Sequence, residues 1–565
     1  MAAALGRPAL ALALGALHGA SFAPPIDGGW PQFALFAALA GLVWSDPRRT
    51  PARAARVGLA FALGTFALGL RWLHTAMHVY GGMPWALAAA ALVLFALYLS
   101  LYPALALALA ARLAGPGGTS RAAPDARTAP AVARGCVLAA ATGAAWGAGE
   151  MLRGWMFTGF PWLSIGYAHV DGPLAGFAPW LGVYGIGILA AASATLAASA
   201  FSAAIRGGAG IRAAAALTVL AALPFAAGAF LERVPLTAPQ GTPVRVRLAQ
   251  GNVAQHTKFD REHALRAMDD YARLVEDSRA RLTVLPETAW IVPWSATPPE
   301  LAQRLLRALA LGGGALALGM PLAQPPDGGP ARYANTVALL DARSAARAGD
   351  AQVLARYDKR HLVPFGEFVP PGFGWFVRLM EIPLGDFGRG AAAQPPFVVD
   401  GQRFAFDVCY EDLFGEEIAE QVRAPVSASV LVNASNLAWY GESDAQPQHL
   451  AIARMRALET GRPVIRATNT GVTASIDHRG RVLASLPQWR QGALDVDVQG
   501  TAGLTPYARF GNAAALALAL VRRAQQAQQL LSIFGRSQQQ RRKAFEQRAL
   551  GLAARGGLRH RKVSG

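Results

Sequence analysis

The chain has 565 residues, of which 53% are hydrophobic and 16% are charged, and its mean hydropathy is +0.27. This length exceeds one ordinary domain, and a soluble domain carries about 25% charged residues, so much of the chain is expected to lie in lipid. The formal net charge is +18. Many arginines lie in short loops between apolar segments and in the residues after 520. This distribution indicates anionic lipid headgroups and argues against a nucleic-acid partner.

Seven apolar segments precede residue 235. They occupy residues 4–22, 31–45, 57–73, 84–111, 135–152, 175–204 and 213–231. Several reach the length of about 20 residues that a helix needs to cross a hydrocarbon core of about 30 Å. The first segment resembles a signal peptide, but its basic start is weak and further segments follow, so we expect a retained helix. The sequence therefore predicts a multi-pass membrane α-helical bundle over residues 1–235.

Arginines concentrate in alternate loops of this bundle. The even-numbered loops hold Arg48, Arg49, Arg53, Arg56, Arg112, Arg121, Arg127, Arg134, Arg206 and Arg212. The odd-numbered loops hold far fewer, with Arg71 near the third and Arg153 in the fifth. Short basic loops stay in the cytoplasm. The N-terminus is therefore predicted on the cytoplasmic side of a bacterial inner membrane, and the polar part of the chain is expected on the periplasmic side.

Residues 243–500 have the pattern of a separate domain. Strands are predicted at 244–253, 281–285, 315–320, 334–341, 396–399, 403–409, 428–433, 463–467, 471–477 and 481–486, and helices at 262–279, 299–311, 414–423 and 444–460. This mixture predicts an α/β domain or a layered α-β-β-α domain.

The last predicted region is residues 501–565. Its apolar segment 511–521 has 11 residues, about 16 Å as a helix, and a basic tail follows it. Two interpretations of this segment remain: a short eighth membrane span, or a helix that lies in the membrane interface.

Three segments of the polar domain carry reactive side chains. Glu287 follows a predicted strand, Lys359 lies eight residues before Glu367, and Cys409 ends another strand. Lysine is rare here, with four among 53 basic residues, which makes Lys359 notable. Taken singly, each of these residues is more often structural, because strand-end glutamates pair with cations and buried cysteines pack. The other cysteine, Cys136, lies in an apolar segment and is interpreted as a packing residue, with no disulfide predicted.

Taken together and in this order, the three segments resemble the nitrilase superfamily, whose signature is a Glu–Lys–Cys triad on an α-β-β-α sandwich. With the preceding apolar segments, the chain is similar to the membrane-anchored apolipoprotein N-acyltransferase family. The matching motifs are Gln250-Gly251-Asn252, Pro286-Glu287-Thr288, Lys359-Arg360-His361-Leu362-Val363-Pro364-Phe365-Gly366-Glu367, Cys409-Tyr410-Glu411, Asn433-Ala434-Ser435-Asn436 with Trp439, and Arg454-Met455-Arg456-Ala457. The long lysine motif and the Cys-Tyr-Glu motif are the specific ones.

The resemblance implies a reaction and a set of partners. An acyl chain would pass from a membrane phospholipid, typically phosphatidylethanolamine, to a thioester on Cys409 by ping-pong transfer. The acceptor would be the N-terminal amine of diacylglyceryl-cysteine in an apolipoprotein. Glu287 would serve as the general base, and Lys359 would stabilise the tetrahedral oxyanion. The family implies no cofactor.

The resemblance also implies supporting residues. Glu367 matches a second carboxylate that holds the lysine and the cysteine in register, and Tyr410 and Glu411 flank the nucleophile. Trp439 is expected to support the site or position the substrate. Aromatic residues crowd the segment after Lys359 and are interpreted as a lipid-contacting arm or lid, with ordinary core packing as the alternative. They are Phe365, Phe368, Phe373, Trp375 and Phe376.

Other features limit the interpretation. The chain departs from the family pattern at Phe259, where the family often has tryptophan. The ten histidines lack paired ligand spacing, so no metal site is predicted. Two alternatives stay open: a membrane-tethered amidase that uses water as acceptor, and a non-catalytic membrane scaffold or transporter. The complete triad and the scarcity of charges inside the apolar segments argue against the second.

Overall fold

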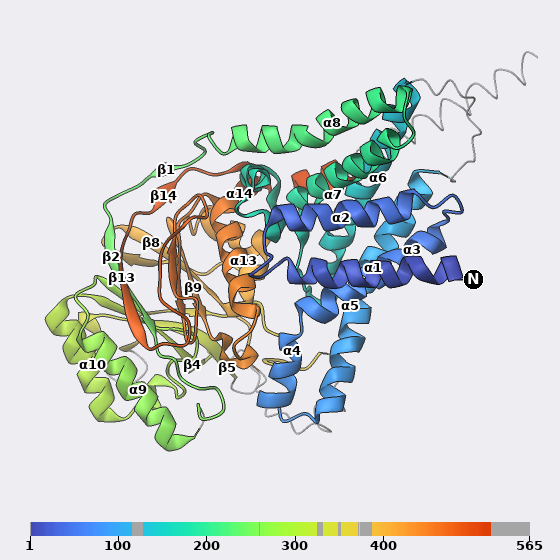
Figure 1. The fold of residues 1–565 in the computed structure, drawn as a ribbon. Helices are drawn as coiled ribbons and strands as arrows, with labels where there is room; N and C mark the ends of the chain where they lie inside the picture. Colours follow the sequence, from blue (N-terminus) through green and yellow to red (C-terminus); the bar gives the residue numbers. More distant parts are fainter. Residues whose placement is uncertain are drawn as a thin grey trace, which may run out of the picture. The chain divides into compact units, whose positions relative to one another are not determined.

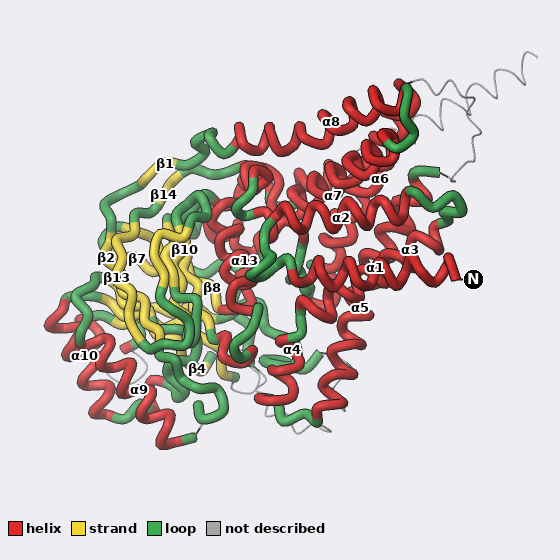
Figure 2. Tube along the Cα trace, in the orientation of Figure 1, coloured by secondary structure: helices red, strands yellow, loops and turns green. Residues whose placement is uncertain are grey.

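The computed structural model describes residues 2–115, 128–258, 260–324, 332–347, 352–370, 372, 374 and 387–520. Contacts unite the described part of Met1–Leu516 into one compact unit. Within it, helices make up the first half of the chain, and two sheets with flanking helices make up the second half (Figure 2).

Seven long helices fall on the seven predicted apolar segments. They are α1 (Ala2–Ala20), α2 (Gly29–Trp44), α3 (Pro51–Gly69), α5 (Trp85–Leu113), α6 (Thr128–Arg153), α7 (Ala178–Ala204) and α8 (Ala209–Leu231). Helix α3 shows why a boundary falls where it does: the Thr50 side chain accepts a hydrogen bond from the Arg53 N–H, and Pro51 occupies the first turn. The predicted helical half is confirmed.

Length and composition make four of the described helical segments able to cross a membrane. These are Trp85–Leu113, Thr128–Arg153, Pro173–Ala204 and Ala209–Leu231. A fifth crossing results if Pro51–Gly69 and Trp72–Tyr80, which meet at 51°, act as one broken span. That bend separates α3 from α4 (Trp72–Thr75) and the π-helix η1 (Ala76–Tyr80), where the sequence predicted one helix over 57–73. The count of seven spans and the orientation stay predictions.

Helices α1 and α3 touch backbone to backbone. A Cβ atom at Gly15 would lie 1.8 Å from the Phe61 carbonyl oxygen, and one at Gly64 would lie 2.2 Å from that of Leu12. Small residues allow this close approach, which apolar helices use to pack where the hydrophobic effect contributes little.

The second half contains two six-stranded sheets. One has the order β13-β2-β3-β4-β5-β6 and the other β12-β11-β10-β9-β8-β7. The strands of the first are β2 (Val244–Gln250), β3 (Leu282–Val284), β4 (Ala315–Ala323), β5 (Tyr333–Leu340), β6 (Ala355–Asp358) and β13 (Gly492–Val498). Those of the second are β7 (Phe397–Val399), β8 (Gln402–Val408), β9 (Val430–Ser435), β10 (Val464–Thr468), β11 (Ala474–Ile476) and β12 (Val482–Ser485). In each sheet three adjacent strands, β2-β3-β4 and β8-β9-β10, run parallel.

The two sheets pack face to face and carry helices on their outer faces (Figure 1). Side chains such as Val246, Val284, Phe404 and Val432 form the core between the sheets. Helices α9 (Arg261–Glu276) and α10 (Pro299–Gly312) cover the first sheet, and α12 (Gly415–Val422) and α13 (Ala445–Thr460) cover the second. Each outer layer closes its own apolar core. The predicted α-β-β-α sandwich is confirmed.

Two strands of the sandwich were not predicted. Strand β6 has four residues and carries Arg356 and Asp358, so it lacks an apolar alternation. Strand β13 does alternate, with Leu494, Val496 and Val498 between Asp495 and Asp497, but this local pattern was not predicted as a strand. Both are edge strands. Ion pairs Arg247–Asp495 (2.7 Å) and Arg245–Asp497 (3.1 Å) join β13 to β2 across 248 and 252 residues of sequence. The local alternation indicates a strand at β13, but only the fold shows that its partner is β2.

Short elements flank the sandwich. Strand β1 (Ala238–Pro239) pairs with β14 (Thr501–Ala502), and α14 (Pro506–Phe510) follows. Of the predicted apolar segment 511–521, residues 513–520 are helical. The basic tail lies outside the described residues.

Helix α13 joins the sandwich to the helical half (Figure 1). The Gln448 amide oxygen accepts hydrogen bonds from the indoles of Trp72 (3.1 Å) and Trp162 (2.8 Å). Its amide nitrogen donates to the Gly69 carbonyl (3.1 Å). Because all these groups are buried, they fix one helix of the sandwich against the end of α3 and the loop after α6.

Candidate active site

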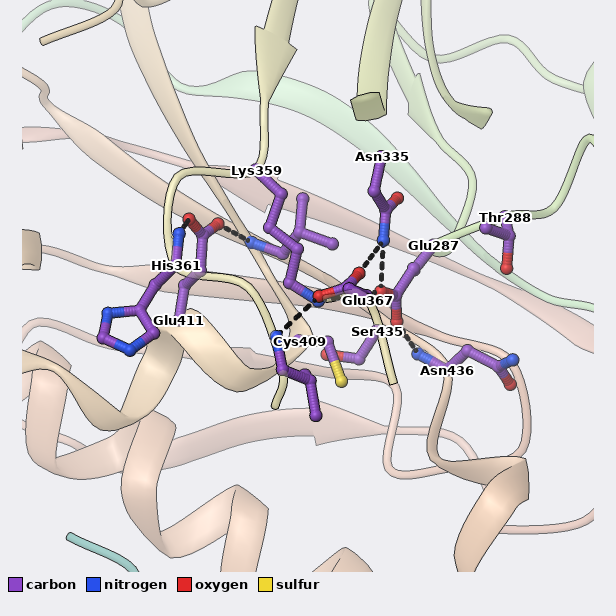
Figure 3. A network of polar contacts seen from close by, with 12 residues as sticks. Glu287, Thr288, Asn335, Lys359, His361, Glu367, Cys409, Glu411, Ser435 and Asn436 are labelled. Atoms are coloured by element: carbon purple, nitrogen blue, oxygen red, sulfur yellow. Dashed lines mark hydrogen bonds and ion pairs between the residues drawn. The ribbon is translucent and has the colours of Figure 1, made fainter. Parts of the chain in front are cut away.

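The side chains of the predicted triad come from strand ends of both sheets. Glu287 follows β3, Lys359 follows β6 directly, and Cys409 follows β8 directly. Figure 3 shows their side chains converging from separate segments, with the Cys409 sulfur on the side of the carboxylates and the ammonium. Because β3 and β8 belong to different sheets, the face-to-face packing of the two sheets brings the glutamate and the cysteine to one place.

Lys359 lies at the centre of a buried polar network. Its ammonium nitrogen is 3.2 Å from Glu287 Oε1 and 3.0 Å from Glu367 Oε1, and the side chain is 1% exposed. The Asn335 amide nitrogen donates to the same two oxygens, at 2.8 and 2.7 Å. The second oxygen of Glu367 accepts from the Val363 N–H (2.8 Å). Two carboxylates thus share one ammonium and one amide, which fixes all four head groups.

The backbone around Glu287 is tightly constrained. A Cβ at Gly319 of β4 would lie 2.2 Å from the Pro286 carbonyl oxygen and 2.9 Å from the Glu287 Cα, so only glycine allows the strand to pass this close. The following residue, Thr288, has a left-handed φ of +48°. The Glu287 Oε2 accepts from the Asn436 N–H at 3.0 Å. Both carboxylate oxygens are therefore held in place.

Cys409 begins a turn in a strained conformation. Its φ is +54°, and its side chain is buried. The carbonyl oxygen of Cys409 lies 3.2 Å from His449 Nε2. The Arg466 guanidinium lies 2.9 Å from His449 Nδ1 and can only donate there, so the proton of the imidazole resides on Nε2. Burial, with help from Arg466, lowers the pKa of His449 well below its usual value. The neutral ring donates to the Cys409 carbonyl and holds this turn.

Electrostatics set the protonation states of the nucleophile and the lysine. Burial and then Glu287 raise the pKa of the Cys409 thiol above its usual range, although Lys359 and the Asn436 N–H oppose this shift. Burial works against the charge on Lys359, but Glu287 and Glu367, with smaller effects from Cys409 and Glu411, raise its pKa well above the usual value. At neutral pH the site therefore holds a neutral thiol and an ammonium. Such a thiol needs a base before it can attack a carbonyl.

Glu411 links the lysine segment to the nucleophile turn. Its Oε1 accepts from the N–H groups of Arg360 (2.7 Å) and His361 (3.0 Å). Its Oε2 accepts from the Val408 N–H (2.6 Å) and the Tyr357 hydroxyl (3.0 Å). The carboxylate thus ties the backbone after Lys359 to the backbone before Cys409.

Tyr410 and Trp439 lie toward the helical half. The Tyr410 hydroxyl donates to the Gly159 carbonyl (2.7 Å) in the loop after α6. Trp439, which is 40% exposed, lies in the short helix η9 (Leu437–Tyr440) edge-on to Tyr80 of η1, with ring centroids 6.4 Å apart. Both contacts direct these side chains toward the helical half, where they are placed to position what approaches the site.

Several residues of the site were not singled out from the sequence. Asn335 bridges the two carboxylates, Asn436 supplies the N–H to Glu287, and His449 holds the Cys409 carbonyl. Asn335 interrupts an otherwise apolar strand, which was a usable signal. Asn436 lay inside a matching motif but had no assigned role. His449 gave no signal, because its two partners lie 17 and 40 residues away.

The predicted aromatic arm is described only in part. Phe365 is 36% exposed, and the ring of Phe368 lies 5.0 Å from the Arg389 guanidinium. Phe259, Phe373, Trp375 and Phe376 lie outside the described residues. Among the residues that are described, no group of three His, Cys, Asp or Glu side chains is arranged to hold a metal ion.

Comparisons with known proteins cover nearly the whole chain. A family model for the apolipoprotein N-acyltransferase N-terminal domain matches residues 14–196, and one for carbon-nitrogen hydrolases matches residues 245–507. The apolipoprotein N-acyltransferase of Bordetella bronchiseptica is 45% identical over 534 residues, covering 91% of this chain and 95% of the relative. That of Ralstonia nicotianae is 45% identical over 510 residues, covering 90% of both chains.

Among solved structures, a mutant of the Nesterenkonia AN1 amidase from the nitrilase superfamily matches 49% of this chain and 96% of its own. Its sequence identity is 21% and its TM-score is 0.33. The first family model ends within α7 and the second begins within β2, and the full-length relatives span both halves. The chain belongs to the apolipoprotein N-acyltransferase family.

Proposed function

We propose that this chain acylates the N-terminal amine of diacylglyceryl-cysteine in apolipoproteins, using a membrane phospholipid as acyl donor and Cys409 as the covalent carrier. Membership of the family makes it an N-acyltransferase enzyme with a phospholipid donor and an apolipoprotein acceptor. One observation supports the residue assignments: a thiol, two carboxylates and one ammonium lie close together in a buried position at the strand ends. Phosphatidylethanolamine is the donor we expect.

In the first half-reaction Glu287 takes the proton of the Cys409 thiol. The sulfur attacks the ester carbonyl of the donor, and the oxyanion that forms is stabilised by the Lys359 ammonium. One such donor contributes roughly 2.7–4 kcal/mol to the transition state. When the intermediate collapses, the carbon–oxygen bond of the ester breaks, and Glu287 gives its proton to the leaving oxygen. A lysophospholipid departs, and the acyl chain stays on sulfur as a thioester.

In the second half-reaction the acceptor amine attacks this thioester. Glu287 removes a proton from the amine as the carbon–nitrogen bond forms, and the same oxyanion position beside Lys359 is used again. The carbon–sulfur bond then breaks, and Glu287 returns the proton to the Cys409 sulfur. The products are an amide and the free thiol, so the site is restored. Splitting the reaction in this way lets one carboxylate serve as base and acid in turn.

The supporting residues act through the triad. Glu367 and the Asn335 amide keep Lys359 aligned with Glu287. Glu411 holds the lysine segment against the nucleophile turn. Tyr410 and Trp439 face the helical half, and we assign them to positioning of the lipid substrates.

The bundle of residues 1–235 gives this site access to its substrates. Both substrates carry acyl chains, and extracting a chain from the bilayer costs about 0.8 kcal/mol per CH₂ group. A catalytic domain of residues 243–500 held against the bilayer avoids that cost. The arginine-rich alternate loops support an inner-membrane location with the catalytic domain on the periplasmic side. Residues 501–565 would follow on that side as a short apolar segment and a basic tail.

Labelled phospholipid tests this proposal in two stages. The full-length protein, incubated with phosphatidylethanolamine labelled in its acyl chain, is expected to gain a label that hydroxylamine removes and that Cys409→Ser lacks. Adding a synthetic diacylated lipopeptide should move the label into an amide on the peptide. Label that appears only as free fatty acid, at an unchanged rate when the lipopeptide is present, would instead assign the chain to the amidase class that uses water.

A further inference from the structure

The His361 side chain joins the catalytic sandwich to the helical half. It lies two residues after Lys359, and its imidazole points away from the Lys359 ammonium (Figure 3). The ring nitrogen Nδ1 is 2.9 Å from Glu417 Oε1 on α12. The other nitrogen, Nε2, is 2.9 Å from the Thr158 carbonyl oxygen in the loop after α6. One imidazole thus connects the lysine segment with the outer helix of the sandwich and with the helical half.

Both ring nitrogens of His361 face groups that accept hydrogen bonds. A carboxylate oxygen and a carbonyl oxygen have no proton to donate, so each ring nitrogen has to supply one. A neutral imidazole carries a single N–H, and therefore only the imidazolium satisfies both contacts. The ring also stacks on Phe414, with centroids 3.5 Å apart and planes at 13°, and an aromatic face attracts a cation. The geometry thus selects the charged form of His361.

The charges around the ring agree with this form. Glu417 also forms an ion pair with Arg360 (3.2 Å), and Arg360 forms a second one with Glu420 (2.8 Å). Two carboxylates and one guanidinium leave one negative charge, which the imidazolium balances. The titratable and charged groups around His361 are Arg360 on its own segment, Tyr410 and Glu411 on the nucleophile turn, and Glu417 and Glu420 on α12.

The loop that His361 contacts has an unusual backbone. Phe157 and Thr158 have left-handed φ angles of +53° and +74°, which non-glycine residues keep only where surrounding contacts hold them. The sandwich holds this stretch at two adjacent carbonyls. The Thr158 carbonyl accepts from His361, and the next carbonyl along the chain accepts from the Tyr410 hydroxyl. Both contacts are needed to keep such a backbone in one conformation.

The same loop displays two large aromatic side chains. Trp155 and Phe157 are both exposed. Aromatic side chains collect at the interface between membrane and water, so this loop is suited to contact lipid. Because the loop is bonded to Tyr410, which follows Cys409 directly, its position bears on how a lipid substrate meets the nucleophile.

Loss of one proton from His361 would break one of the two contacts. A hydrogen bond to a carboxylate is stronger than one to a neutral carbonyl, so the proton that remains stays on Nδ1 beside Glu417. Nε2 then presents a lone pair to the Thr158 oxygen, and the two repel each other. The released proton passes to solvent, which reaches the ring because the side chain is 12% exposed. An imidazole changes charge between about pH 5 and pH 8.

We infer that protonated His361 holds the loop after α6 on the catalytic sandwich, and that this contact is lost as pH rises. The inference rests on the proposed function and adds a regulation to the same site. While the contact is made, the lipid-facing loop stays fixed beside the nucleophile turn. When it is lost, the strained stretch relaxes, and thioester formation on Cys409 slows. His361 is thus a positioning residue, since it acts through the loop.

A pH series on the full-length protein tests this inference. Thioester formation from phosphatidylethanolamine is measured between about pH 5.5 and pH 8.5. The wild-type rate divided by the His361→Gln rate is expected to fall about tenfold over this interval, because only the wild type loses a charge-assisted hydrogen bond as pH rises. His361→Arg keeps a charge and several donors at every pH, so it should exceed the wild-type rate at the alkaline end.

Other groups that titrate in this interval cancel in the ratio. Burial lowers the pKa of Lys258 to about 8 and raises that of Glu411 to about 7, but both residues are present in both proteins. Glu411 accepts from the backbone N–H of His361, which the substitution keeps. His263→Gln is the matched control. His263 also pairs with a carboxylate, Asp260 (2.7 Å), but lies exposed on α9, so its ratio should not change with pH.

The outcomes separate two failures. A His361→Gln ratio that stays constant with pH would leave His361 with a structural role alone and would overturn the pH-dependent contact. If the wild-type protein forms no thioester at any pH, the proposed function itself fails.

Hydrogen exchange on the wild-type protein does not depend on whether a variant folds or on thioester chemistry. After correction for the intrinsic effect of pH, the protection of amides 156–160 is expected to fall about tenfold between about pH 6 and pH 8.5. The amides of β9, in the core of the sandwich, provide the reference and should keep their protection. Constant protection of 156–160 would show that the loop is held independently of the His361 charge and would overturn the inference.

Discussion

Two of the buried charge clusters, one in the helical half and one in the sandwich, are built differently. In the helical half, Glu150 and Arg153 lie in the last turn of α6. In the sandwich, Glu287, Lys359 and Glu367 lie among strand ends around Cys409. Both clusters are closed to water, so burial alone does not identify a functional site.

The partners of these charges show the difference. Glu150 accepts from the Trp146 indole (3.1 Å) and the Ile165 N–H (2.8 Å). Arg153 donates to the carbonyls of Phe160 and Trp162, both at 2.6 Å, and to the Ser164 hydroxyl at 3.0 Å. Each of these hydrogen-bond partners lies within 15 residues in sequence, and the bonds to residues 160–165 hold the loop after α6 against the helix. This cluster therefore stabilises the local structure at the end of α6.

The sandwich cluster draws its members from across the domain. Glu287 meets Asn335, Lys359 and Asn436, which are 48, 72 and 149 residues away. These groups surround the Cys409 thiol, whose pKa is raised, and do not serve to hold a loop. A buried charge whose bonds are local is structural, whereas charges gathered from distant segments around one reactive atom make a catalytic site. Substitutions in the two clusters should therefore differ in whether they lower activity or stability.

Removing the nucleophile should have the largest effect. Cys409→Ala is expected to lower N-acylation of a diacylated lipopeptide by about 10⁴-fold or more, because no other group can carry the acyl chain. The rate is measured with purified protein and labelled phospholipid. Cys136→Ala, in α6, serves as the matched control and should keep the wild-type rate. Substantial transfer by Cys409→Ala would contradict a thioester mechanism.

Removing the base should have the second largest effect. Glu287→Gln keeps the shape and the hydrogen bond from Asn335 but cannot accept the thiol proton, so thioester formation should slow by about 10²–10⁴-fold. Single-turnover labelling of Cys409 measures this step. Glu420→Gln, on a half-exposed partner of Arg360, is the control for loss of a carboxylate. A rate within twofold of wild type in Glu287→Gln would remove Glu287 from the mechanism.

The raised pKa of Cys409 predicts an unusual pH dependence. An ordinary thiol has a pKa of about 8.5, so its alkylation rises roughly 25-fold between pH 7 and pH 9. The Cys409 pKa is raised by burial and by Glu287, so the thiol stays protonated across this interval. Iodoacetamide labelling of Cys409, followed by mass spectrometry, is therefore expected to be much slower than that of glutathione at each pH. It should still rise about 100-fold over this interval, because the thiolate fraction of a thiol whose pKa lies well above 9 grows tenfold per pH unit. A rate close to that of glutathione, with the same 25-fold rise, would show that the thiol ionises freely.

His449 should have an intermediate effect as a positioning residue. His449→Phe removes the donor to the Cys409 carbonyl and leaves the Arg466 side chain without its imidazole partner. We expect kcat to fall about tenfold, since one buried hydrogen bond is worth roughly 0.5–1.5 kcal/mol, with little change in KM for the donor. His449→Gln, which can still donate at this position, should recover part of kcat. A change confined to KM would indicate a substrate-binding role instead.

Arg153 should affect stability and leave the chemistry unchanged. Arg153→Met leaves three buried acceptors without a donor, which costs about 1–3 kcal/mol of unfolding free energy. Thermal unfolding in detergent should shift downward, while the rate per folded molecule stays within about twofold of wild type. A loss of turnover at unchanged thermal stability would make the helical cluster catalytic and would remove the contrast drawn above.

Local sequence patterns were enough to predict the architecture and the reactive residues. Long apolar runs identify helices because a lipid-exposed segment must be apolar along its whole length, and alternating or amphipathic runs identify most strands and helices of the sandwich. Glu287, Lys359 and Cys409 were identified by their residue types within motifs of a known family, since the chemistry requires those groups.

Which other residues complete the site depends on how the two sheets pack against each other. Edge strand β6 is short and has no apolar alternation, while the alternation of β13 was a usable signal whose partner β2 lies far away in sequence. Asn335 and His449 acquire their roles from neighbours that lie 17 to 48 residues away in sequence. A hydrogen bond acts over about 3 Å of space whatever the separation along the chain, and that distance exists only after the sheets have packed.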